Sequence, residues 1–129
     1  EGAWDEAVKG VDGIIHTATQ VNLDAIEPKE IIDPAVNGVL GLLNSAMKYG
    51  SSLQRIVYTS SCAAIKGTSP TKAVSVSEAD WNDEPVKECE KKGKEASGFT
   101  KYDASKTLAE RGTLCGSFTS STNPKSTGM

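Results

Sequence analysis

A tyrosine and a lysine lie four residues apart in the stretch YDASKTLAE, at Tyr102 and Lys106. Residues at this spacing share one face of an α-helix, so both side chains are expected to point the same way. A phenol ordinarily has a pKa of about 10, and a neighbouring ammonium lowers that pKa because it favours the phenolate. The pair is therefore expected to act as a general acid and base. The same spacing also fits two polar residues on a solvated helix face.

Ser61 is the third residue with suitable chemistry. The stretch LQRIVYTSS predicts a buried strand that runs into a polar loop and ends in this serine. A hydroxyl placed there can hold a substrate carbonyl by a hydrogen bond while Tyr102 supplies a proton. A nicotinamide would supply the hydride, so the three side chains together suit carbonyl reduction. The alternative is an ordinary strand end, where serine and threonine are common.

The order of elements that would position these residues is strand, long helix, strand. VDGIIHTAT predicts the first strand, preceded by the end of a helix in WDEAVKG, and EPKEIIDPAVNGVLGLLNSAMKYG contains the helix. Pro34 is expected near the helix start and Gly50 at its C-cap. This order is typical of the crossover in a parallel sheet, where ligands bind at the carboxyl ends of the strands, here HTAT and TSS.

The remainder of the chain is more polar. Residues 66–97 predict a long surface excursion with a short helix near EPVKECEKKG, and a further helix is predicted to begin near Phe99. The chain of 129 residues makes at most one domain, and its net charge of −3 argues against a nucleic-acid partner. A polar N-terminus and the lack of a bilayer-length apolar run predict a cytoplasmic protein without a membrane partner. The three cysteines are expected to be free thiols.

Five stretches, in order and spacing, resemble the extended short-chain dehydrogenase/reductases. They are VDGIIHTAT, DPAVNGVLGLLNSAMKYG, QRIVYTSSCAAI, EADWND and YDASKTLAE. The chain most resembles the branch with dihydroflavonol reductase, cinnamoyl-CoA reductase and fungal methylglyoxal and D-lactaldehyde reductases. Within that branch, the sequences of the five stretches are most similar to those of the fungal members. The resemblance implies an α/β fold, a partial Rossmann-like doubly wound parallel sheet. It also implies an oxidoreductase that reduces a small aldehyde or ketone with NADP, with NAD as the alternative cofactor.

The resemblance assigns roles to individual residues. It implies catalytic roles for Ser61, Tyr102 and Lys106. It implies cofactor contacts for residues in the two strand-end loops and on the second helix: Thr17, Ala18, Thr19, Thr59, Ser60, Tyr102 and Lys106. His16 is read as a packed histidine rather than a proton carrier, and Trp81 as a packing residue. Asn37 either supports the active-site backbone or is a helix-surface residue.

Two departures from the family pattern shape the expected domain organisation. Residues 1–111 match the central part of the NAD(P)-binding domain, so the glycine-rich βαβ unit and the C-terminal substrate region are expected to be lacking. Residues 112–129 are rich in Ser, Thr and Gly and predict a disordered, aberrant tail, for which a shift of reading frame near Arg111 would account. The chain is thus expected to be an incomplete, inactive fragment with poor solubility or a molten state.

Two other functions stay open at this stage. Epimerases and dehydratases of the same superfamily share the Tyr-Lys helix and the TSS strand, and recycle their nicotinamide. Alternatively, the chain is a non-catalytic remnant or interaction module. The sequence does not specify the substrate or the oligomeric state.

Overall fold

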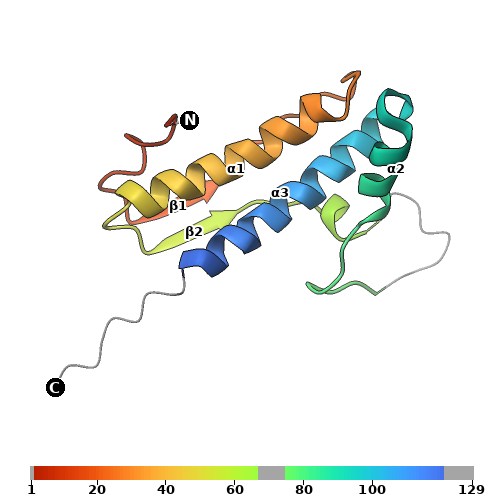
Figure 1. Cartoon of the computed structure of the whole chain (residues 1–129). Coiled ribbons are helices and arrows are strands. Elements are labelled where there is room, and N and C mark those ends of the chain that lie inside the picture. The colour runs from red at the N-terminus through yellow and green to blue at the C-terminus, as the bar shows by residue number, and fades with distance from the viewer. Residues whose placement is uncertain (1, 67–74, 121–129) are drawn as a thin grey trace.

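The chain folds as a parallel β-α-β unit extended by two further helices (Figure 1). A computed structural model describes residues 2–66 and 75–120, with side chains as far as residue 114. The first unit consists of β1 (Gly13–His16), α1 (Lys29–Tyr49) and β2 (Arg55–Tyr58). It is followed by the 3-10 turn η1 (Cys62–Ala64), α2 (Glu84–Lys92), the 3-10 turn η2 (Gly93–Glu95) and α3 (Gly98–Ser120). This is the partial Rossmann-like arrangement that the sequence predicts.

The two strands pair in parallel, and their ends are aligned. The register joins Gly13 to Arg55 at the start and His16 to Tyr58 at the end. Parallel strands need a long crossover, which α1 supplies. The loops that follow His16 and Tyr58 therefore leave the sheet side by side.

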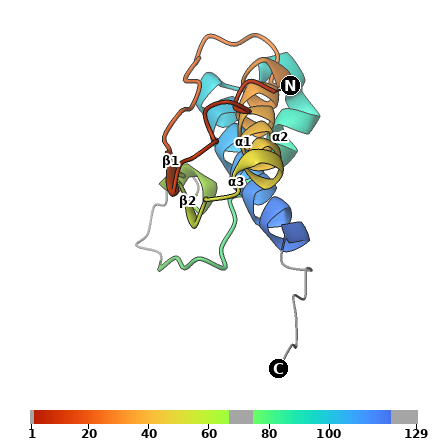
Figure 2. The same cartoon turned by 90° about the vertical axis from the view of Figure 1, so that its left-hand side faces the viewer.

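The helices cover one face of this sheet. α1 and α3 lie side by side and pack against each other, and Figure 2 shows both on the same side of the strands. Buried apolar side chains such as Val39 and Leu42 on α1 and Ala104 and Ala109 on α3 form much of the core. On the opposite face, the register partners Ile15 and Val57 are 75% and 47% exposed.

Two local predictions near the N-terminus differ from the structure. WDEAVKG forms turns rather than the end of a helix, and Gly10 closes them with a φ of 70°. α1 begins at Lys29, so Pro34 lies inside the helix. The Glu30 carboxylate in the first turn of α1 accepts a hydrogen bond from the Ile26 backbone N–H at 3.1 Å and so ties the preceding loop to this helix start.

α3 continues beyond the point where the sequence predicts the end of regular structure. The helix runs to Ser120, past Arg111, and the Thr113 hydroxyl donates to the Glu110 carbonyl at 2.5 Å. Residues 121–129, the rest of the predicted tail, lie outside the described residues. The boundary at residue 111 stays a prediction.

Candidate active site

The two strand ends bring the predicted cofactor loops together. The Thr59 backbone N–H donates to the His16 carbonyl at 3.0 Å, so the pairing continues one residue beyond the strands. Thr17, Ala18, Thr19 and Thr59 are all exposed beside this junction. Thr17 and Ala18 border a hollow of about 240 Å³ on the β1 side. These positions leave hydroxyl and backbone groups open to a ligand at the carboxyl edge of the sheet.

Ser61 and Tyr102 line one pocket. Its volume is about 350 Å³, and its other lining residues include Val21, Leu23 and Phe99. Ser61 precedes η1, and its Oγ accepts a hydrogen bond from the Ala63 backbone N–H at 3.2 Å. Because Oγ is the acceptor in that bond, the hydroxyl proton is left to donate to a second group. Tyr102, half-buried on the first turns of α3, faces the same space.

Lys106 lies one helical turn beyond Tyr102 and is anchored on the second strand end. Its side chain is 3% exposed, and Nζ donates to the Thr59 carbonyl at 3.5 Å. The same Nζ lies 5.5 Å from the centroid of the Tyr58 ring. Burial lowers the pKa of the Lys106 ammonium, and the Glu110 carboxylate opposes that shift. The ammonium is thus held at the junction from which Thr59, Ser60 and Ser61 emerge.

Ser60 points to a different partner from Ser61. Its hydroxyl donates a short hydrogen bond to the Glu110 carboxylate on α3. Both serines border an open hollow that also contains Glu110 and Glu78. The consecutive serines therefore separate: one hydroxyl ties β2 to α3, and the other faces the pocket of Tyr102.

His16 is packed among rings, as the sequence reading favoured. It is 6% exposed, edge-on to Trp4 with ring centroids 5.8 Å apart, and stacked on Tyr58 at 5.7 Å. Burial lowers the pKa of the imidazole, and the Lys106 charge lowers it further. The neutral ring is therefore the form that this packing favours.

Asn82 is a supporting residue that the sequence analysis did not single out. Its amide nitrogen donates to the carbonyls of Ala63 at 2.8 Å and Lys66 at 3.1 Å, and thereby fixes the turn after Ser61. The Thr107 hydroxyl on α3 donates to the Asn82 carbonyl at 3.2 Å. Asn82 lies within the EADWND stretch, and that motif was the available signal. Asn37, in contrast, is exposed on α1, which fits the helix-surface reading.

Trp81 packs against a cation: the Arg111 guanidinium carbon lies 4.7 Å from its ring centroid.

Among the described side chains, Cys62 and Cys89 are free thiols. In the same part of the chain, no cluster of three or more His, Cys, Asp or Glu side chains could hold a metal ion. No helix within the described residues is long and apolar enough to cross a membrane.

The chain is similar in sequence to several curated reductases and similar in structure to a solved reductase. A dihydroflavonol 4-reductase of Arabidopsis thaliana is 36% identical over 113 residues, which cover 86% of this chain and 28% of the relative. Cinnamoyl-CoA reductase CAD2 of Medicago truncatula is 42% identical over 113 residues, with coverage of 85% and 32%. The solved yeast methylglyoxal/isovaleraldehyde reductase Gre2, complexed with NADPH, has a TM-score of 0.72 at 30% identity and matches 86% of this chain and 32% of that one.

These matches also show how much of its relatives' length the chain covers and from which organisms those relatives come. The chain spans about a third of the length of the curated relatives named here. Both are plant proteins, so they do not support the closer fungal likeness expected from the sequence. Residues 1–114 match the NAD-binding family described as Male sterility protein. The chain therefore belongs to this NAD-binding family and, within the extended short-chain dehydrogenase/reductases, stands among NAD(P)-dependent reductases.

Proposed function

We propose that Ser61, Tyr102 and Lys106 form the catalytic group of an NADP-dependent reductase that converts a small aldehyde or ketone into the alcohol. The observation that carries this proposal is the shared pocket, which Ser61 and Tyr102 line from two separate elements. The yeast relative was solved with NADPH, which favours NADP over NAD.

The chain's own residues have defined tasks in this proposal. Ser61 donates its free hydroxyl proton in a hydrogen bond to the substrate carbonyl oxygen, since its Oγ already accepts from Ala63. Tyr102 donates a proton to the same oxygen as the alcohol forms. Lys106 holds a positive charge one turn away and stabilises the phenolate that Tyr102 leaves behind. When bound, NADPH supplies a hydride to the carbonyl carbon.

The residues at the strand ends fit the nicotinamide half of the cofactor. Thr17, Ala18, Thr19 and Thr59 are exposed at the adjacent carboxyl ends of β1 and β2, where hydroxyl and backbone groups are available. Ser60 lies beside them, although its hydroxyl is engaged by Glu110. Lys106 would reach the ribose from the same edge. We propose these residues as the cofactor contacts.

A chimera provides the test, because the chain spans about a third of its curated relatives. Residues 1–111 would replace the matching part of the yeast reductase, and NADPH oxidation would be followed with methylglyoxal and isovaleraldehyde. The Tyr102→Phe and Ser61→Ala variants should each lower kcat/KM by roughly 10²- to 10⁴-fold, the usual effect of removing a general acid or an oxyanion donor. Tyr49→Phe, at the far end of α1, is the matched control and should retain activity.

The outcomes separate the competing functions. Full activity in Tyr102→Phe contradicts the proposed mechanism. Turnover of sugar nucleotides, without reduction of aldehydes, supports an epimerase or dehydratase. A folded chimera that binds NADPH but has no activity supports a non-catalytic remnant.

A further inference from the structure

We propose that Lys101 is a positioning residue that fixes the apolar wall of the candidate pocket and so favours carbonyl substrates with an apolar body. The use of the pocket for substrate rests on the proposed function. Lys101 immediately precedes Tyr102 on α3 and is only 3% exposed. A lysine buried to this extent is unusual unless its ammonium is fully hydrogen-bonded.

The ammonium of Lys101 has three backbone acceptors. Nζ donates to the carbonyls of Ala25 at 2.9 Å, Ile26 at 2.8 Å and Lys94 at 3.0 Å. An ammonium has three hydrogens, so these bonds use its complete donor capacity. They join α3 to two segments that are remote from each other in sequence: the loop between β1 and α1, and η2.

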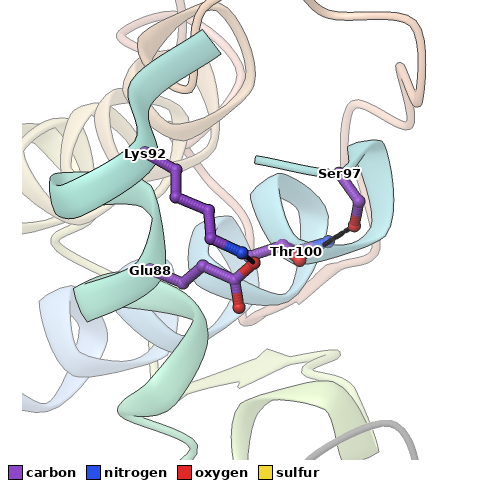
Figure 3. Close-up of polar contacts among 4 residues, drawn as sticks. All are labelled: Glu88, Lys92, Ser97 and Thr100. Carbon is purple, nitrogen blue, oxygen red and sulfur yellow. Dashed lines mark hydrogen bonds and ion pairs between the residues drawn. The ribbon is translucent and has the colours of Figure 1, made fainter. Parts of the chain in front are cut away.

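Gly98 provides a second contact between the same loop and the same helix turn. A Cβ added to Gly98 would lie 2.0 Å from the Leu23 carbonyl oxygen, so no larger residue fits without moving the loop. The helix start itself is fixed by Ser97, whose Oγ accepts from the Thr100 backbone N–H at 3.0 Å and whose hydroxyl lies 2.8 Å from that of Thr100 (Figure 3). The first turn of α3 is therefore a fixed platform for the loop.

The loop held in this way supplies one wall of the pocket. Val21 and Leu23 line the space that Ser61 and Tyr102 share, and both side chains are substantially exposed. Between Thr17 and Pro28 the loop contains no helix or strand, so its position depends on contacts such as those of Lys101 and Gly98. A substrate with an apolar body would pack against this wall, whereas a two-carbon aldehyde would contact mainly Ser61 and Tyr102.

The first test is hydrogen–deuterium exchange on the 129-residue chain. Lys101→Met removes the ammonium but keeps the stem, and should accelerate amide exchange in residues 17–28 on the order of tenfold while α1 retains its protection. Lys101→Arg keeps the charge and donors and should restore part of the protection. Lys91→Met, at an exposed lysine of α2, is the control and should leave the loop unchanged. Unchanged exchange in the loop, or equal acceleration throughout the chain, would overturn the proposal.

The second test measures binding without cofactor or turnover, by NMR titration with benzaldehyde and acetaldehyde. Lys101→Met should weaken benzaldehyde binding by about tenfold, because the displaced loop loses the contacts of Val21 and Leu23 with the aromatic ring. Acetaldehyde, which would make few of these contacts, should bind within about twofold of its original affinity. Gly98→Ala displaces the same loop by steric contact and should have the same effect, which keeps the test decisive if Lys101→Met does not fold. Equal weakening for both aldehydes, or no binding of benzaldehyde by the unmodified chain, overturns the role of Lys101. The titration involves no hydride transfer. The effect of Lys101 on aldehyde binding can therefore be interpreted even if the proposed reductase activity is not found.

Discussion

The ammonium of Lys106 lies over the ring of Tyr58, with Nζ 5.5 Å from the ring centroid and 3.5 Å from the Thr59 carbonyl oxygen. A cation in this place gains from the negative face of the ring. Since Tyr58 is the register partner of His16, the ring is itself fixed by the sheet. The position of the candidate catalytic lysine is thus determined by β2 as well as by α3.

Replacement of Tyr58 by leucine should destabilise the chain by about 1–3 kcal/mol, because both the cation–π contact and part of the ring packing are lost. Tyr58→Phe retains the ring and should cost less than about 1 kcal/mol. Urea unfolding monitored by circular dichroism measures both. A double-mutant cycle with Lys106→Met should give a coupling of about 0.5–2 kcal/mol, and a coupling of zero would show that the ring does not hold the ammonium.

Glu110 should keep Lys106 protonated. Burial lowers the pKa of the ammonium from its ordinary value of 10.5, and the Glu110 carboxylate raises it. Glu110→Gln removes the opposing charge, so the pKa should fall further, as followed by NMR of the Lys106 side chain. Since the folded-state pKa is below the unfolded one, the unfolded chain binds more protons just below pH 10.5, and this lysine makes stability rise with pH there. Glu90→Gln on α2 is the control, and an equal shift in both variants would contradict the assignment.

The sequence was sufficient for the two strands and the helix between them, because the signals of these elements are local. β-Branched residues in GIIH and RIVY predict the strands, and the spacing of Val36, Leu40, Leu43 and Met47 predicts the helix between them. The shared pocket of Ser61 and Tyr102 agrees with their expected proximity near the carboxyl end of β2, the end of the strands at which ligands bind in parallel sheets. The catalytic roles of these residues stay predictions.

The supporting contacts could not be predicted, because they join a side chain to backbone groups far along the chain. The sequence analysis did not single out Lys101, whose ammonium donates to the carbonyls of Ala25, Ile26 and Lys94. Asn82 was likewise not singled out, although its amide nitrogen donates to the carbonyls of Ala63 and Lys66 beyond Ser61. Neither the periodicity nor the charge pattern contains information about which backbone carbonyl a side chain will reach.

We propose that the residues after Arg111 are translated in a shifted reading frame. Codons exist that encode RGTLCGSFTSSTNPKSTGM in one frame and WDLVRKFYEQHKPEVNWD in the frame two bases later. The second string has stronger helix formers than the first, which is rich in Gly, Ser and Thr. Sequencing of the transcript across Arg111 should reveal an insertion, a deletion or a misplaced splice junction. An uninterrupted cDNA that continues in frame to Met129 would reject the proposal.

The stability of the chain should decrease as the pH falls below 6.5, and His16 should account for a defined part of that decrease. Burial lowers the pKa of this imidazole from 6.5, with the Lys106 charge as a second cause. The unfolded chain therefore binds the proton first, and the stability that neutral His16 contributes is lost as the pH falls through this range. His16 is the only histidine, so His16→Phe should flatten the dependence of the urea midpoint between pH 7.5 and 5.5 while carboxylate effects remain in both proteins. Identical slopes for the two proteins would mean that the imidazole accepts its proton as readily between Trp4 and Tyr58 as it does in water.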